Sequence, residues 1–99
     1  MSLNHLTWPE AKAYFKHFSH GKVDEAGEHA FIYAQDMIRE SEDGQTLYIG
    51  RAGIGGIEFV YRRGSPEIWA FYPIEGDLQW KALGIEEFVK DWLAGDINV

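Results

Sequence analysis

Apolar residues recur along this chain with two different periods, and each period predicts a different element. Two segments have apolar positions at helical spacing: Ala11, Tyr14, Phe15 and Phe18 in the first, and Ile85, Phe88, Val89, Trp92 and Leu93 in the second. The spacing predicts amphipathic helices over 8–19 and 85–94. The first helix opens with a Thr7–Glu10 capping box, with Leu6 placed to staple against Ala11, and ends at Gly21. We expect the second to pack through Phe88, Trp92 and Leu93.

Between the helices, short runs rich in β-branched and aromatic residues predict strands. A polar connector over 22–28 leads to "HAFIYA" (29–34), and "QDMIRE" (35–40) can form one or two helical turns. Four strand-like runs follow: "TLYIG", "GIEFVYRR", "PEIWAFYPI" and "LQWKAL". Turn signals separate them at Asp43-Gly44, Gly64-Ser65 and Gly76-Asp77. The order predicts one α+β domain over 1–99, with a largely antiparallel, curved sheet of four or more strands and helices on one face.

The glycine-rich segment "IGRAGIGG" (49–56) raises the possibility of a phosphate-binding loop. A dinucleotide fingerprint needs a third spaced glycine and a following helix, and a Walker loop needs Lys and then Ser or Thr. Here Ile57 follows the last glycine, and the next run alternates like a strand. We therefore interpret the glycines as a bend or bulge at the sheet edge.

Charge narrows the classes of partner. The net charge is −7, spread as −4 over 1–49, +2 over 50–63 and −5 over 64–99. Binding to nucleic acid requires a basic surface, so a protein with this net negative charge is not expected to bind nucleic acid. Its electrostatic field favours a basic partner instead. There is no apolar run of membrane-spanning length, no signal-like start and no cysteine, so we expect a cytoplasmic protein without membrane association.

Candidate catalytic groups are weak, and we predict neither enzymatic activity nor a cofactor. No serine lies in a nucleophile elbow, and the acidic pairs are sequence neighbours on exposed segments. His17, His20, Glu28 and His29 offer metal donors, but their spacing matches no known ligand pattern. Metal binding is therefore the weakest of the hypotheses kept here.

The C-terminal half, "GIEFVYRRGSPEIWAFYPIEGDLQWKALGIEEFVKDWLAGDINV", resembles the SUKH superfamily, the domain of the Smi/Knr cell-wall regulators and of many bacterial relatives. In that family a glycine-rich turn, two strands, an acidic-glycine turn and a helix beginning like "xxEEFV" follow one another. "HAFIYAQDMIRE" is similar to the preceding strand and short helix, and Pro9, Phe15 and Gly21 keep the spacing of the opening pattern. Trp8, Lys12 and His20 depart from it.

The resemblance implies a non-enzymatic protein-binding module. Bacterial members typically act as immunity proteins that neutralise a partner toxin, and many such toxins are basic. A regulatory or scaffold domain of the same fold is the alternative. Whether the chain is a monomer or a homodimer stays open.

Aromatic and acidic residues together mark a candidate partner-binding surface around the last hairpin. Its residues are Glu67, Glu75, Asp77 and Trp80, near Trp69 and Tyr72. Exposed aromatic rings supply most of the affinity of protein interfaces, whereas charges supply orientation and association rate. The acidic connector with Asp24, Glu25 and Glu28 is the second candidate.

Overall fold

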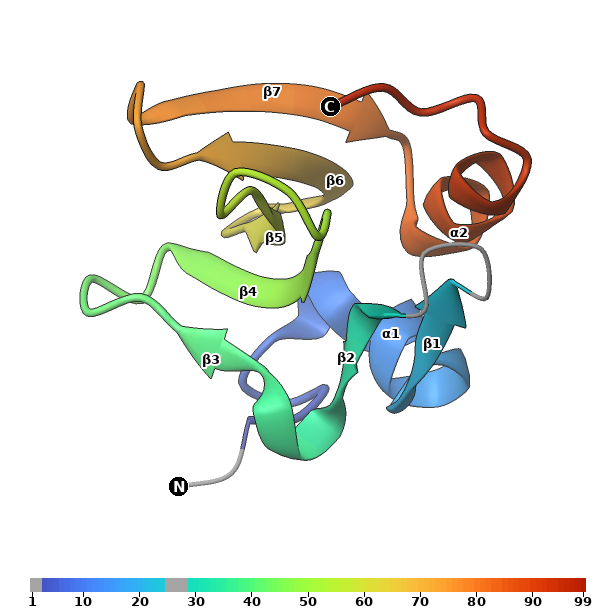
Figure 1. The fold of residues 1–99 in the computed structure, drawn as a ribbon. Coiled ribbons are helices and arrows are strands. Elements are labelled where there is room, and N and C mark those ends of the chain that lie inside the picture. The colour runs from blue at the N-terminus through green and yellow to red at the C-terminus, as the bar shows by residue number, and fades with distance from the viewer. Residues whose placement is uncertain (1–2, 25–28) are drawn as a thin grey trace.

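The computed structural model describes residues 3–24 and 29–99, which form a sheet and two short helical regions (Figure 1). A 3-10 turn, η1 (Pro9–Ala11), runs into α1 (Lys12–His17), and the C-terminal helix is α2 (Ile85–Leu93). The strands are β1 (His20–Asp24), β2 (His29–Ala34), β3 (Arg39–Glu40), β4 (Thr46–Arg51), β5 (Glu58–Arg62), β6 (Ser65–Tyr72) and β7 (Asp77–Ala82), with a second 3-10 turn, η2 (Gln35–Met37), before β3.

The seven strands form one antiparallel sheet in the order β1-β2-β4-β5-β6-β7. The short β3 shares the edge of β4 with β2, pairing Arg39 with Tyr48. In the ribbon, β4 to β7 stack above one another and the sheet then bends toward β2 and β1 (Figure 1). The α+β class and the curved antiparallel sheet are confirmed.

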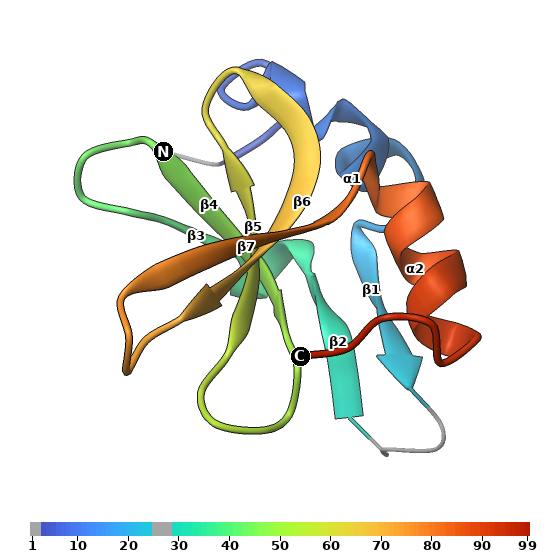
Figure 2. The ribbon, with the colours of Figure 1, turned by 90° about the horizontal axis from the view of Figure 1, so that it is seen from above.

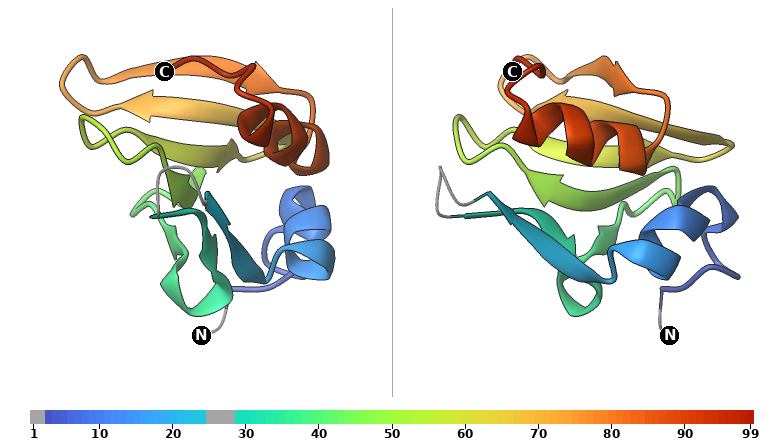
Figure 3. Two further views of the ribbon diagram at one scale, coloured as in Figure 1. Left: turned by 45° about the vertical axis from the view of Figure 1, so that its right-hand side comes forward. Right: turned by 90° about the vertical axis from the view of Figure 1, so that its right-hand side faces the viewer.

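Both helices lie on the same side of the sheet (Figures 2 and 3). Phe88 from α2 and Tyr14 from α1 are fully buried there, together with Phe31 and Phe59 from the strands. The Phe88 and Phe59 rings meet edge to face with centroids 4.6 Å apart. No helix in the part of the chain described is long and apolar enough to cross a membrane.

The prediction for α2 is right in its extent but wrong for one residue. Phe88 packs in the core and Trp92 packs against its edge, as expected, whereas Leu93 is 50% exposed. Ile85 and Val89 complete the buried stripe instead. The reason is that 3.6 residues per turn carry position 93 past the edge of the narrow apolar face.

The predicted capping box does not form. The Glu10 carboxylate accepts hydrogen bonds from the backbone N–H of Gly64 and from the Arg63 guanidinium, so it joins the helix start to the β5–β6 hairpin. The Thr7 hydroxyl donates to the carbonyl of Asn4, and Leu6 is exposed rather than stapled. Helix α1 is also shorter than predicted, because its first turn is 3-10 and it ends at His17.

Three further boundaries differ from the prediction. Lys22 lies in β1 rather than in a connector, because residues 20–24 pair with β2; residues 25–28 lie outside the described part. The β5–β6 turn is Arg63-Gly64, since Arg62 already pairs with Ser65. "QDMIRE" forms only the η2 turn and then β3.

The glycine-rich segment is a bulge and a loop, as predicted. The β4–β5 register shifts between Tyr48 and Gly50, and a Cβ at Gly50 would lie 2.0 Å from the carbonyl oxygen of Phe31. Only glycine lets β4 cross β2 this closely. Gly53, Gly55 and Gly56 then adopt positive φ in the loop before β5.

Candidate functional site

The sheet face opposite the helices, the open face, carries a row of large side chains. Tyr48, Val60, Trp69 and Trp80 are direct partners on β4, β5, β6 and β7. Directly paired residues project on the same side of a sheet, so the four side chains form one continuous row across four strands. We call it the aromatic row.

Val60 shows how closely this row is packed. It is fully buried, yet it does not belong to the core cluster beneath the helices. The side chains of the open face must therefore cover it. Phe71 adds to this cover, since its ring meets Tyr48 edge to face at 6.4 Å. Trp80 ends the row on the edge strand and is 48% exposed.

The structure divides the four predicted partner-binding residues among three places. Glu67 lies two residues before Trp69 on β6, so both side chains share the open face with Trp80. Glu75 lies in the β6–β7 turn, beyond the end of β6. Asp77 pairs with Tyr72, whose side chain packs against the core beneath the helices, so Asp77 projects from the helix-covered face and not from the open face.

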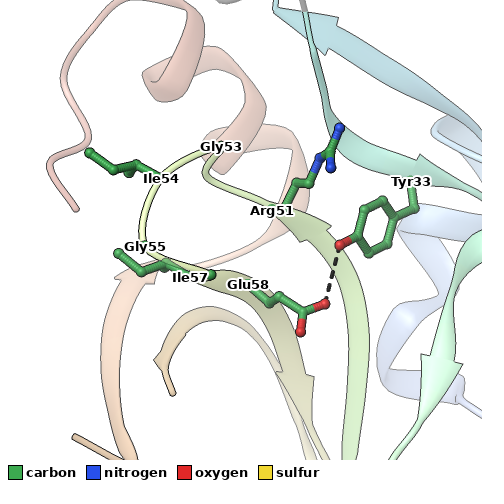
Figure 4. Close-up of a pocket in the computed structure, with 8 residues that line it drawn as sticks. Tyr33, Arg51, Gly53, Ile54, Gly55, Ile57 and Glu58 are labelled. Atoms are coloured by element: carbon green, nitrogen blue, oxygen red, sulfur yellow. Dashed lines mark hydrogen bonds between the residues drawn. The ribbon is translucent and has the colours of Figure 1, made fainter. Parts of the chain in front are cut away.

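A polar cluster borders the aromatic row at the end near the glycine loop. Glu58 accepts two hydrogen bonds from the Arg39 guanidinium, at 2.6 and 2.8 Å. It accepts a third from the Tyr33 hydroxyl at 3.1 Å, drawn as the dashed line in Figure 4. The hydrogen bonds to Glu58 raise the pKa of Arg39, and burial together with the Glu58 charge raises the pKa of Tyr33. Arg39 also lies 4.2 Å above the centre of the Tyr48 ring, which joins the cluster to the row.

Two hollows adjoin this cluster and share Tyr33 and Arg51 as lining residues. One, of about 420 Å³, lies beneath the glycine loop and includes Ile54. The other, of about 410 Å³, lies against β1 and β2 and includes Lys22. Arg51 pairs with Glu58 in the β4–β5 register, but Arg39 and Tyr33 occupy that carboxylate.

The candidate metal donors do not come together within the described residues. His17 lies 3.6 Å from Glu86 of α2, a contact between two exposed side chains. Over residues 3–24 and 29–99, no group of three or more His, Asp or Glu side chains is placed to hold a metal ion. Glu28, one of the proposed donors, falls outside those residues.

Sequence reasoning missed the polar cluster, since its residues come from separate parts of the chain. Tyr33, Arg39 and Glu58 lie on β2, β3 and β5, and only the pairing of β3 and β5 with β4 brings them together. One signal was present: residues 50–63 are basic within an acidic chain. Three arginines, at 39, 51 and 62, and two glutamates, at 58 and 67, belong to the open face and its border, so this side is not acidic.

The chain was compared with protein-family models, with curated proteins and with solved structures, and no match was found in any of them. The resemblance to the SUKH superfamily therefore stays a prediction.

Proposed function

We propose that this protein is a non-enzymatic protein-binding module that docks its partner on the open face. The observation that carries the proposal is the aromatic row, which crosses four strands and ends in the half-exposed Trp80. A sheet face with no helix over it normally carries polar side chains, because it faces water. Aromatic side chains held rigidly at such a face are typical anchors of protein interfaces.

Charge around the row supports a role in orientation. Glu67 lies on the same face and Glu75 lies in the β6–β7 turn beside it, whereas Asp77, at the start of β7, projects from the helix-covered face. Arg62, two residues from Val60 on β5, lies on the same side of the row as Glu67, because Tyr61 pairs with Ile68 and Arg62 with Ser65. A partner would thus meet an apolar centre with charges of both signs at its rim, the usual anatomy of an interface.

Within this class, we propose an immunity-type protein that binds and neutralises a toxin domain, in line with the resemblance stated above. The alternative is a regulatory or scaffold domain that binds a non-toxic partner on the same face. Co-expression separates the two: an immunity protein restores growth of cells that produce the partner, whereas a scaffold partner does not inhibit growth in the first place.

The surface itself is tested with a matched pair of variants. Trp80 and Leu93 are 48% and 50% exposed, but Leu93 lies on α2, on the helix side. Partner captured from the native organism is titrated against wild type, Trp80→Ala and Leu93→Ala. We expect Trp80→Ala to weaken binding by at least about thirtyfold, as for a hot-spot ring, and Leu93→Ala by less than about threefold. Equal effects, or loss only in Leu93→Ala, would refute docking on the open face.

Association kinetics test the two acidic residues Glu75 and Asp77 at the β6–β7 turn separately from the aromatic row. In the Glu75→Lys/Asp77→Lys double variant, we expect slower association and a weaker dependence on salt, with little change in dissociation. Association at the wild-type rate would remove these two residues from the recognition surface and leave the aromatic row as the tested element.

A further inference from the structure

The two hollows adjoin each other at Tyr33 and Arg51, and we call the pair the Arg51 groove. Tyr33 and Arg51 line both hollows, so the space beneath the glycine loop lies next to the space beside β1 and β2. In the close-up, the Arg51 side chain projects from β4 beside the Tyr33 ring, and Tyr33 points toward Glu58 (Figure 4). Each hollow, at about 420 and 410 Å³, has the volume of a small-molecule site.

Arg51 is the unusual group in this groove. Its direct cross-strand neighbour is Glu58, which would ordinarily neutralise it. Both oxygens of Glu58 are taken, one by Arg39 and the other by Arg39 and Tyr33. Arg51 is exposed and makes no ion pair with any residue in the described part of the chain. An arginine in this position keeps its full capacity for a bidentate anion.

The charge of the groove is opposite to that of the protein. Arg39, Arg51 and Lys22 line it, and Glu58 is its one acidic lining residue among those described. A local excess of positive charge in a chain of net charge −7 attracts a negative ligand to this one place. The same net charge disfavours a nucleic acid, whose backbone needs a wide basic footprint.

The groove also exposes apolar side chains that an ion alone would not use. Val23 and Met37 line the half beside β1 and β2, and both are more than half exposed; Ile54 is equally exposed at the glycine loop. Apolar side chains at both ends, with a cation between them, match a peptide in which apolar residues flank an acidic one.

We propose that the Arg51 groove binds an extended acidic and apolar segment of the partner protein, with a carboxylate paired to Arg51 and an apolar side chain packed on Val23 and Met37. This inference rests on the proposed function, because it assigns a second contact region to the same kind of partner. It differs from that function in its chemistry, since the segment it selects is acidic.

The test uses the free protein and synthetic peptides, so it does not depend on capturing the partner. A short peptide of alternating Leu and Asp is titrated into isotopically labelled protein and followed by amide chemical shifts. Leu–Lys and Ser–Asp peptides probe the charge and the apolar contribution, and a peptide with phosphoserine in place of Asp probes the anion. We expect the Leu–Asp peptide to shift Lys22, Arg51 and residues 53–56, and to bind more tightly than the other three.

A matched pair of variants places the cation. Arg51→Gln should weaken the Leu–Asp peptide by at least about tenfold, whereas Lys12→Gln, the same charge change on exposed α1, should alter it by less than about twofold. Arg51→Lys should bind the Leu–Asp peptide with intermediate affinity, because lysine keeps the positive charge but lacks the planar guanidinium that pairs with both oxygens of a carboxylate.

Several results would overturn the proposal: no shifts in the groove up to millimolar peptide, equal effects of the two Gln variants, or tighter binding of the Leu–Lys or Ser–Asp peptide. Tighter binding of the phosphoserine peptide would overturn the carboxylate assignment in favour of a phosphorylated segment. The Trp80 experiment can fail while these titrations succeed, and the reverse, so the two proposals are refuted separately.

Discussion

Arg63 joins the N-terminal segment to the sheet, and replacing it with methionine gives the sharpest test of the fold. Its guanidinium donates to the carbonyls of Thr7 and Gly44 and to the carboxylates of Glu10 and Glu40, at 2.8 to 3.3 Å. It also lies 3.6 Å from the centre of the Trp8 ring, which is fully buried. Arg63→Met keeps most of the apolar stem and removes all of these polar contacts.

The expected loss follows from the partial exposure of the groups. The Arg63 side chain is 32% exposed, and Glu10 only 11%. Removing one partner of a fully buried ion pair costs about 3–5 kcal/mol, whereas an exposed pair is worth about 0–1 kcal/mol. We therefore expect Arg63→Met to lower the free energy of unfolding by about 2–3 kcal/mol, a large fraction of the stability of a small domain.

Urea unfolding at neutral pH, followed by tryptophan fluorescence, measures this loss. Arg62→Met is the matched control: Arg62 is the preceding residue, and its buried Nε has no hydrogen-bond partner in the described structure. Because removing a donor without a partner costs no hydrogen bond, we expect the control to lower stability by less than about 0.5 kcal/mol. If Arg63→Met costs less than about 1 kcal/mol, or no more than the control, Arg63 does not hold the N-terminal segment to the sheet.

Two further predictions concern the same core. Burial alone would raise the pKa of Glu10, but the Gly64 N–H bond and the Arg63 charge outweigh it and hold that pKa below the usual 4.5. This contribution to stability is complete above about pH 4.5 and is lost as the pH falls through the lowered pKa. Glu10→Gln should therefore make the urea midpoint fall less steeply with decreasing pH in the acid range. A slope equal to that of the wild type would contradict this prediction. The Trp92 ring stacks on Phe31 with centroids 5.5 Å apart, and its indole N–H donates to the Asp24 carboxylate at 2.9 Å. In the same urea assay, Trp92→Ala should lower the free energy of unfolding by about 3 kcal/mol and Trp92→Phe by about 1 kcal/mol. An unaltered midpoint for Trp92→Ala would place the ring outside the core.

The sequence by itself determined the elements whose signal is local. Helix α2 and strands β4 to β7 were predictable, because an apolar period of 3.6 or 2 records which side of each element is buried. Turns that contain glycine were equally predictable, since a backbone position with positive φ, such as that of Gly76, strongly favours glycine. Both faces of β6 are apolar in the sequence, a pattern typical of an interior strand, and β6 lies between β5 and β7.

Only the tertiary structure decided features that depend on pairing between distant segments. Residues 22–24 belong to the segment predicted as a polar connector, yet they lie in β1, because backbone pairing with β2 needs no apolar pattern. Glu10 fits a capping box, yet it bonds to Arg63 and Gly64, because a charged partner across the core outweighs a local cap. Among the described residues Arg51 has no ion pair, because the β3–β4 pairing brings Arg39 to the Glu58 carboxylate, and no local pattern in the sequence encodes that competition.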